Sequence, residues 1–220
     1  MGLRFTTVIF DMDGTLFDTE RLAVQALATA FGEHGVTVPA HAFEHVIGLA
    51  SKDTRAYLSR FAPAGIDAEG ILRRGGELIE ARLSRDGMPM KSGVANLLAY
   101  LHGRGTALAV ATSTRTASAM RNLQRANIAH YFGAVVGGDA VPNAKPYPDI
   151  YLRALSELER SADEAIAIED SDHGIKSAHA AGLRVICVPD IKPIAAAIQA
   201  LAHRQYHSLD ELHAELVQAS

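Results

Sequence analysis

A short apolar run that ends in two acidic residues constrains this chain more than any other feature. Residues 8–10 are β-formers and favour a buried strand, and Asp11 and Asp13 follow before Gly14 breaks the strand. Side chains two positions apart in an extended chain point the same way. At the carboxyl end of a parallel strand they reach the crevice where α/β sheets bind ligands. The alternative is an ordinary Asp-Gly turn after a solvated strand end.

Two neighbouring carboxylates repel each other, so the pair predicts a compensating cation. Mg²⁺ suits this place because it binds one or two carboxylates together with substrate phosphate. With the metal present, one aspartate could attack a phosphoryl group as a covalent nucleophile. The other could protonate the leaving oxygen and then deprotonate water.

The rest of the chain alternates strand and helix patterns, apart from one long helical block. Further strands are expected at residues 107–111, 134–136, 165–168 and 183–188. This alternation predicts an α/β fold with a Rossmann-like parallel sheet. Residues 17–87 carry helical spacing throughout. We therefore expect a core domain at residues 1–16 and 88–220 and an all-helical cap domain at residues 17–87.

Composition excludes several classes of protein. The chain has 220 residues and a net charge of −4, which argues against a nucleic-acid binder or a disordered chain. No apolar run approaches the length of a membrane helix, and no signal peptide is expected. The single cysteine, Cys187, lies in an apolar run and is expected in the core. We expect a monomer in a reduced cytoplasmic setting, without nucleic-acid or membrane partners.

Polar residues also follow the later strands. Thr112 and Ser113 could bind an anion, Lys145 could neutralise a phosphate, and Glu169 with Asp170 could complete a metal site. Taken singly, each has an ordinary alternative: a helix cap, a solvated lysine, or acids at a helix N-terminus. Their joint placement at or just after the carboxyl ends of successive strands favours one site.

These residues resemble the four motifs of the haloacid dehalogenase superfamily in order and spacing. The motifs are the stretch from Asp11 to Thr15, Thr112 with Ser113, Lys145 with Pro146, and Glu169 to Ser171. The resemblance covers essentially the whole chain. The helical block is similar to the cap of the branch that includes β-phosphoglucomutase and phosphoglycolate phosphatase.

The resemblance implies a role for each motif. Asp11 would be the nucleophile that forms an aspartyl-phosphate, and it would also ligate Mg²⁺. Asp13 would be the general acid and base, with its backbone carbonyl on the metal. Asp170, with Glu169, would complete the metal site.

The resemblance also implies how a phosphoryl group is held. Thr112 and the backbone of Ser113 would hold the transferring group, and Lys145 would bridge that group and Asp11. In the cap, the resemblance suggests Thr19, Ser51 and Lys52 as substrate-binding candidates. An ordinary role for Lys52 at a helix start is an equal alternative.

The expected function is therefore a Mg²⁺-dependent phosphatase for a small phosphorylated metabolite. A sugar phosphate mutase is the first alternative. The histidine that β-phosphoglucomutase carries after its hinge is missing from residues 19–24, and its later asparagine is replaced by Arg115 or Thr116. A receiver-like regulatory module is the second alternative, but a receiver lacks the inserted helical block.

Overall fold

The computed structural model describes residues 4–46, 51–62 and 67–219. The chain divides into two compact units, one formed by Met1–Phe17 with Met90–Ser220 and the other by Asp18–Pro89.

The first unit is built on a six-stranded sheet whose strand order is β3-β2-β1-β4-β5-β6. All neighbouring strands run parallel. The strands are β1 (Thr7–Phe10), β2 (Ala107–Thr112), β3 (Ala134–Gly137), β4 (Ala165–Glu169), β5 (Arg184–Cys187) and β6 (Arg204–Gln205). This confirms the predicted α/β fold class. The two-residue strand β6 was missed, because a strand that short has no periodicity to detect.

Strand β1 lies in the middle of the sheet, and its side chains from Val8 to Phe10 are apolar on both faces. All four of its residues are buried, which is typical of a parallel strand covered on both sides. Phe10 is in register with Val110 of β2 and with Ile168 of β4. Residue 11 therefore leaves the sheet between the ends of two other strands.

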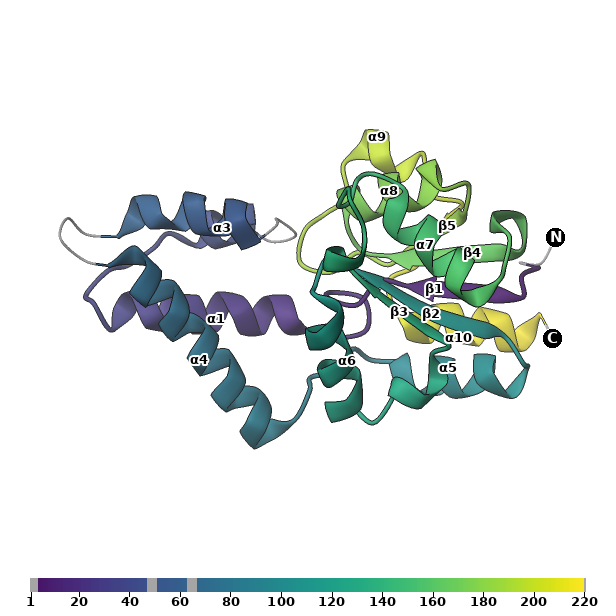
Figure 1. The fold of residues 1–220 in the computed structure, drawn as a ribbon, viewed down its shortest axis with the longest axis horizontal. Helices are drawn as coiled ribbons and strands as arrows, with labels where there is room; N and C mark the ends of the chain where they lie inside the picture. The colour runs from purple at the N-terminus through teal and green to yellow at the C-terminus, as the bar shows by residue number, and fades with distance from the viewer. Residues whose placement is uncertain (1–3, 47–50, 63–66, 220) are drawn as a thin grey trace. The chain divides into compact units, whose positions relative to one another are not determined.

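Helices cover both faces of this sheet (Figure 1). They are α5 (Val94–Gly103), α6 (Thr116–Arg125), α7 (Asp149–Leu158), α8 (Asp172–Ala180), α9 (Ala196–Gln199) and α10 (Leu209–Gln218). Helices α7 and α8 pack on the face that carries Ile9 and Ala167. Helices α5 and α10 lie on the other face, where the Tyr100 hydroxyl donates to the Leu216 carbonyl at 2.9 Å. Helix α9 is the shortest of them, with four residues.

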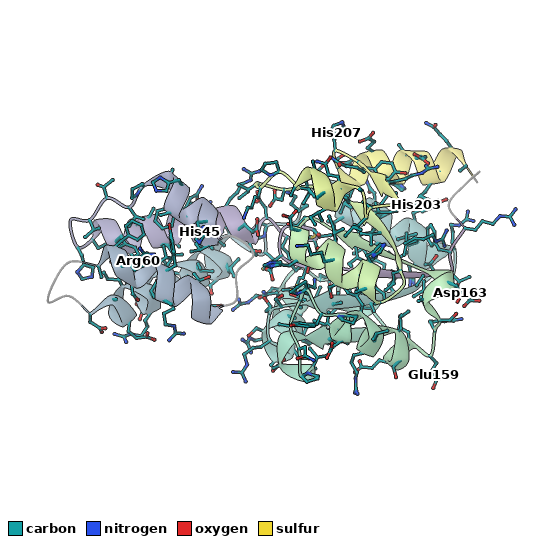
Figure 2. The ribbon with its side chains drawn as sticks, turned by 90° about the horizontal axis from the view of Figure 1, so that it is seen from above. His45, Arg60, Glu159, Asp163, His203 and His207 are labelled. Carbon is teal, nitrogen blue, oxygen red and sulfur yellow. The ribbon has the colours of Figure 1, made fainter. Side chains whose placement is uncertain are left out.

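The second unit contains α1 (Thr19–Gly32), α2 (Ala40–Val46), α3 (Ser51–Leu58) and α4 (Ala68–Asp86). Its own core is formed by side chains that include Phe31, Phe43 and Leu58. An aromatic contact joins two of its helices, since the rings of His45 and Tyr57 lie 4.2 Å apart. Figure 2 shows His45 and Arg60 on this unit. None of the helices within the described ranges is long and apolar enough to cross a membrane.

Cys187 allows a direct test of the core. Its side chain is fully buried at the end of β5. Burial raises the pKa of the Cys187 thiol to about 12, and the nearby carboxylates of Asp170 and Glu169 add to the effect. The thiolate is the reactive form, so native protein at pH 8 should react with a thiol reagent far more slowly than protein in denaturant. Equal labelling rates in the two states would contradict this packing.

Candidate active site

Four segments bring polar side chains to the carboxyl edge of the sheet in the first unit. Asp11 follows β1, Thr112 ends β2 and Glu169 ends β4. Lys145 lies in the segment between β3 and α7. Because parallel strands share one carboxyl edge, residues far apart in sequence meet there.

Lys145 is the centre of this site. Its ammonium group donates to Asp11 Oδ1 at 2.5 Å, to Glu169 Oε1 at 2.6 Å and to the Ala111 carbonyl at 2.9 Å. The lysine side chain is only 5% exposed. An ammonium group has three N–H donors, so these acceptors use all of its donor capacity. The position of the cation is therefore defined by three elements at once.

The pKa values of this cluster follow from burial and charge. Burial raises the pKa of Asp11 well above its ordinary value, and the Lys145 cation offsets only part of that rise. Burial lowers the pKa of Lys145, but the carboxylates of Asp11 and Glu169 outweigh it and hold that pKa above its ordinary value. The lysine is thus charged, and the aspartate would ionise more readily with a further cation beside it.

Glu169 is held on all sides. Its Oε1 accepts from Lys145 and from the Tyr151 hydroxyl, each at 2.6 Å. Its Oε2 accepts from the Asp170 N–H and from the Ser171 hydroxyl, each at 3.2 Å. A Cβ atom added to Gly174 would lie 1.9 Å from the Glu169 carboxylate. The carboxylate therefore packs directly on the first turn of α8, where only glycine leaves room for it.

The donor set fits Mg²⁺. Carboxylate oxygens of Asp11, Glu169 and Asp170 lie within 4.8 Å of one another. Hard oxygen ligands are those that Mg²⁺ prefers, and these three carboxylates carry more negative charge than the one Lys145 cation can balance. Gly14 has a φ of +89°, and a Cβ atom there would lie 2.1 Å from Asp170 Oδ2. Glycine at this position lets the loop after β1 approach the Asp170 carboxylate.

Asp13 is oriented by hydroxyl groups from the end of β2. Thr114 donates to Asp13 Oδ2 at 2.7 Å, and Thr112 donates to the same oxygen with a longer separation of 3.4 Å. The Thr112 hydroxyl also accepts from the Thr114 N–H at 3.1 Å. The structure thus brings Asp13 and Thr112 together and adds Thr114, which was not among the predicted site residues.

Thr116 has a structural role. Its N–H and its hydroxyl both donate to Asp139 Oδ1, at 2.8 and 2.9 Å. The hydroxyl also accepts from the Gly137 N–H at 3.1 Å. These contacts tie the first residue of α6 to Asp139 and to the end of β3. They also lower the pKa of Asp139, mainly through the hydrogen bond from the Thr116 backbone. The Thr116 hydroxyl is therefore engaged within the fold.

The expected cap residues belong to the second unit. Thr19 begins α1, in the other unit. Ser51 and Lys52 begin α3, but their side chains lie outside the described residues, as do residues 47–50 just before them.

Tyr151 is a fully buried residue at this site that the sequence patterns did not reveal. It lies in α7 among apolar neighbours such as Ile150, Ala154 and Leu155, and so has the pattern of a core position. Burial, with the Glu169 and Asp11 charges, raises the pKa of its hydroxyl well above the ordinary value. Tyr151 is therefore a protonated hydrogen-bond donor. The available signal was an aromatic residue with a hydroxyl six residues after Lys145, in the first turn of α7.

Comparison with known proteins supports one family. The sequence model of a family described as haloacid dehalogenase-like hydrolase matches residues 8–188. Protein CbbY of Cereibacter sphaeroides is 34% identical over 192 residues, covering 83% of each chain. A phosphorylated carbohydrates phosphatase of Thermotoga maritima is 31% identical over 179 residues, covering 81% of this chain and 82% of the relative.

The fold of this chain is also similar to that of a solved structure. A crystal structure of a CbbY variant from Rhodobacter sphaeroides, in complex with xylulose-1,5-bisphosphate, has a TM-score of 0.76 at 29% identity. The match covers 94% of this chain and 96% of that one.

The contact between Gly14 and Asp170 predicts a metal-binding defect. Gly14→Ala should displace the Asp170 carboxylate and weaken Mg²⁺ binding by about 10-fold or more, as changes around metal ligands commonly do. Gly105→Ala is the matched control, because Gly105 also has a positive φ (+71°) but open space around a new Cβ. Both variants should lose stability, since alanine is strained there. Isothermal calorimetry with Mg²⁺ alone should show an affinity loss only in Gly14→Ala; equal affinities would refute the contact.

Proposed function

The chain belongs to the haloacid dehalogenase-like hydrolase family, and within it we propose a Mg²⁺-dependent phosphatase that hydrolyses a small phosphorylated metabolite. The observation that carries the proposal is the buried contact of Lys145 with Asp11, next to a second aspartate held by Thr114. A carboxylate fixed by a cation at a sheet edge is suited to attack phosphorus. The second carboxylate, two residues on, is suited to move protons.

The proposed reaction has two steps. In the first, a carboxylate oxygen of Asp11 forms a bond to phosphorus, the bond from phosphorus to the leaving oxygen breaks, and Asp13 gives its proton to that oxygen. In the second, Asp13 takes a proton from water as the water oxygen attacks phosphorus, and the bond to Asp11 breaks to release phosphate. Lys145 stabilises negative charge on the phosphoryl oxygens in both steps, and Thr112 with Ser113 orients the group.

Mg²⁺ would be held by carboxylates of Asp11 and Asp170 and by the backbone carbonyl of Asp13. It would supply positive charge that offsets the phosphoryl oxygens and favours the ionised form of Asp11. Glu169 belongs to the same acidic cluster.

A sugar phosphate is the substrate class we propose. A relative named as a phosphorylated carbohydrates phosphatase and a neighbour in complex with a sugar bisphosphate support it. Hydrolysis is favoured over the mutase alternative because residues 19–24 lack a histidine and because Thr116 is engaged with Asp139. We propose that the enzyme is a cytoplasmic monomer, as its sequence predicts.

A substrate panel with a nucleophile variant tests the reaction. Sugar phosphates, phosphoglycolate and nucleoside monophosphates are incubated with protein and Mg²⁺, and free phosphate and isomerised sugar phosphate are measured separately. Free phosphate should be released from sugar phosphates, and EDTA or Asp11→Asn should abolish it. Appreciable turnover by pure Asp11→Asn would remove Asp11 as nucleophile. Isomerised product with little free phosphate would establish the mutase instead.

Lys145→Ala should lower kcat by at least about 10²-fold, as loss of other electrostatic stabilisers does. Lys176→Ala is the control, because Lys176 is exposed on α8. The Lys145 change leaves buried carboxylates without their cation, so thermal unfolding of both variants must show folded protein at the assay temperature. A folded Lys145→Ala enzyme with a near-native rate would exclude Lys145 from the reaction.

A further inference from the structure

Tyr151 is a buried side chain at the site that the proposed reaction does not use. We propose that Tyr151 is a positioning residue: its hydroxyl holds Glu169, and Glu169 in turn holds Lys145 against Asp11. In this arrangement Glu169 supports the lysine and is not a direct ligand of the metal. The inference rests on the proposed function, in which Lys145 and Asp11 act on the phosphoryl group.

The first observation is that Tyr151 contacts both Glu169 and Lys145. Its hydroxyl donates to Glu169 Oε1 at 2.6 Å, within a fully buried environment. The Lys145 ammonium lies 5.2 Å from the centre of the Tyr151 ring, close enough for a cation–π contact. Tyr151 therefore borders the lysine with its ring and the glutamate with its hydroxyl.

The second observation is that Glu169 has no oxygen left over for a metal ion. A carboxylate accepts about four hydrogen bonds, and Glu169 accepts four, two on each oxygen. Direct ligation would displace a buried donor, which is costly because the donor would lose its partner. Nearness within the acidic cluster thus does not by itself make Glu169 a ligand.

The third observation is that Glu169 cannot withdraw toward α8. Gly174 lies directly against the carboxylate, so the glutamate is enclosed between α8 and the Tyr151 hydroxyl. Without that hydroxyl, Oε1 keeps only Lys145 as a donor and the carboxylate can turn. Lys145 then loses a fixed acceptor, and its distance to Asp11 is no longer defined. Small misplacements of this kind lower rates strongly.

Tyr151→Phe removes only the hydroxyl and tests the proposal. The matched control is Tyr206→Phe, because Tyr206 is also buried and its hydroxyl donates to a carboxylate, Glu215 Oε2, at 2.9 Å. For Tyr151→Phe, kcat on the best sugar phosphate should fall about 10-fold to 100-fold, as expected for partners that orient site residues. KM and the Mg²⁺ dissociation constant from calorimetry should stay within about threefold of wild type. Tyr206→Phe should keep the wild-type kcat.

Three outcomes would overturn the proposal. One is a wild-type kcat in Tyr151→Phe. Another is a loss of Mg²⁺ affinity as large as the loss of kcat, which would make Glu169 a metal ligand. The third comes from combining Tyr151→Phe with Glu169→Gln: if the losses in kcat simply multiply, the tyrosine does not act through the glutamate.

A crystal structure of Tyr151→Phe separates this proposal from the proposed function. We expect a turned Glu169 carboxylate and a longer distance from Lys145 Nζ to Asp11. This readout needs no turnover, so it decides the role of Tyr151 even if the wild-type protein releases no phosphate from any substrate. An unchanged Lys145 position in that structure would refute the positioning role.

Discussion

The buried ammonium group of Lys145 between two carboxylates is the interaction on which the site depends. A buried charge is stable only when it is paired and hydrogen-bonded, and Lys145 meets this condition with three acceptors. These acceptors come from residues that follow β1 or lie in β2 and β4. The cluster therefore forms only when those strands are correctly paired, so the fold and the site are specified together.

The position of β1 explains why so much chemistry gathers at one point. A central parallel strand has neighbours on both sides, and the registers bring Asp11 next to the ends of β2 and β4. Glycine then allows close approach in two places, at Gly14 beside Asp170 and at Gly174 beside Glu169. The acidic residues are thus held by backbone packing as well as by hydrogen bonds.

The charges at this edge divide into two groups with different partners. Glu169 is satisfied by protein donors, including Lys145 and Tyr151, and forms a rigid support. Asp11 keeps a raised pKa even beside the lysine, because burial outweighs that single cation. In our interpretation, the metal supplies the further positive charge beside Asp11. Glu169 holds Lys145 in a fixed position.

Local sequence patterns were enough to predict the α/β fold, the strand ends that carry Asp11, Thr112 and Glu169, and the loop that carries Lys145. Apolar runs with polar residues at their ends are visible without any tertiary information. The roles of Tyr151 and Gly174 were decided only by the tertiary structure. In sequence, Tyr151 is one more apolar position of an amphipathic helix and Gly174 one more small residue. Their partner Glu169 lies on a different element, and the chain's local periodicity does not encode which buried hydroxyl meets which buried carboxylate.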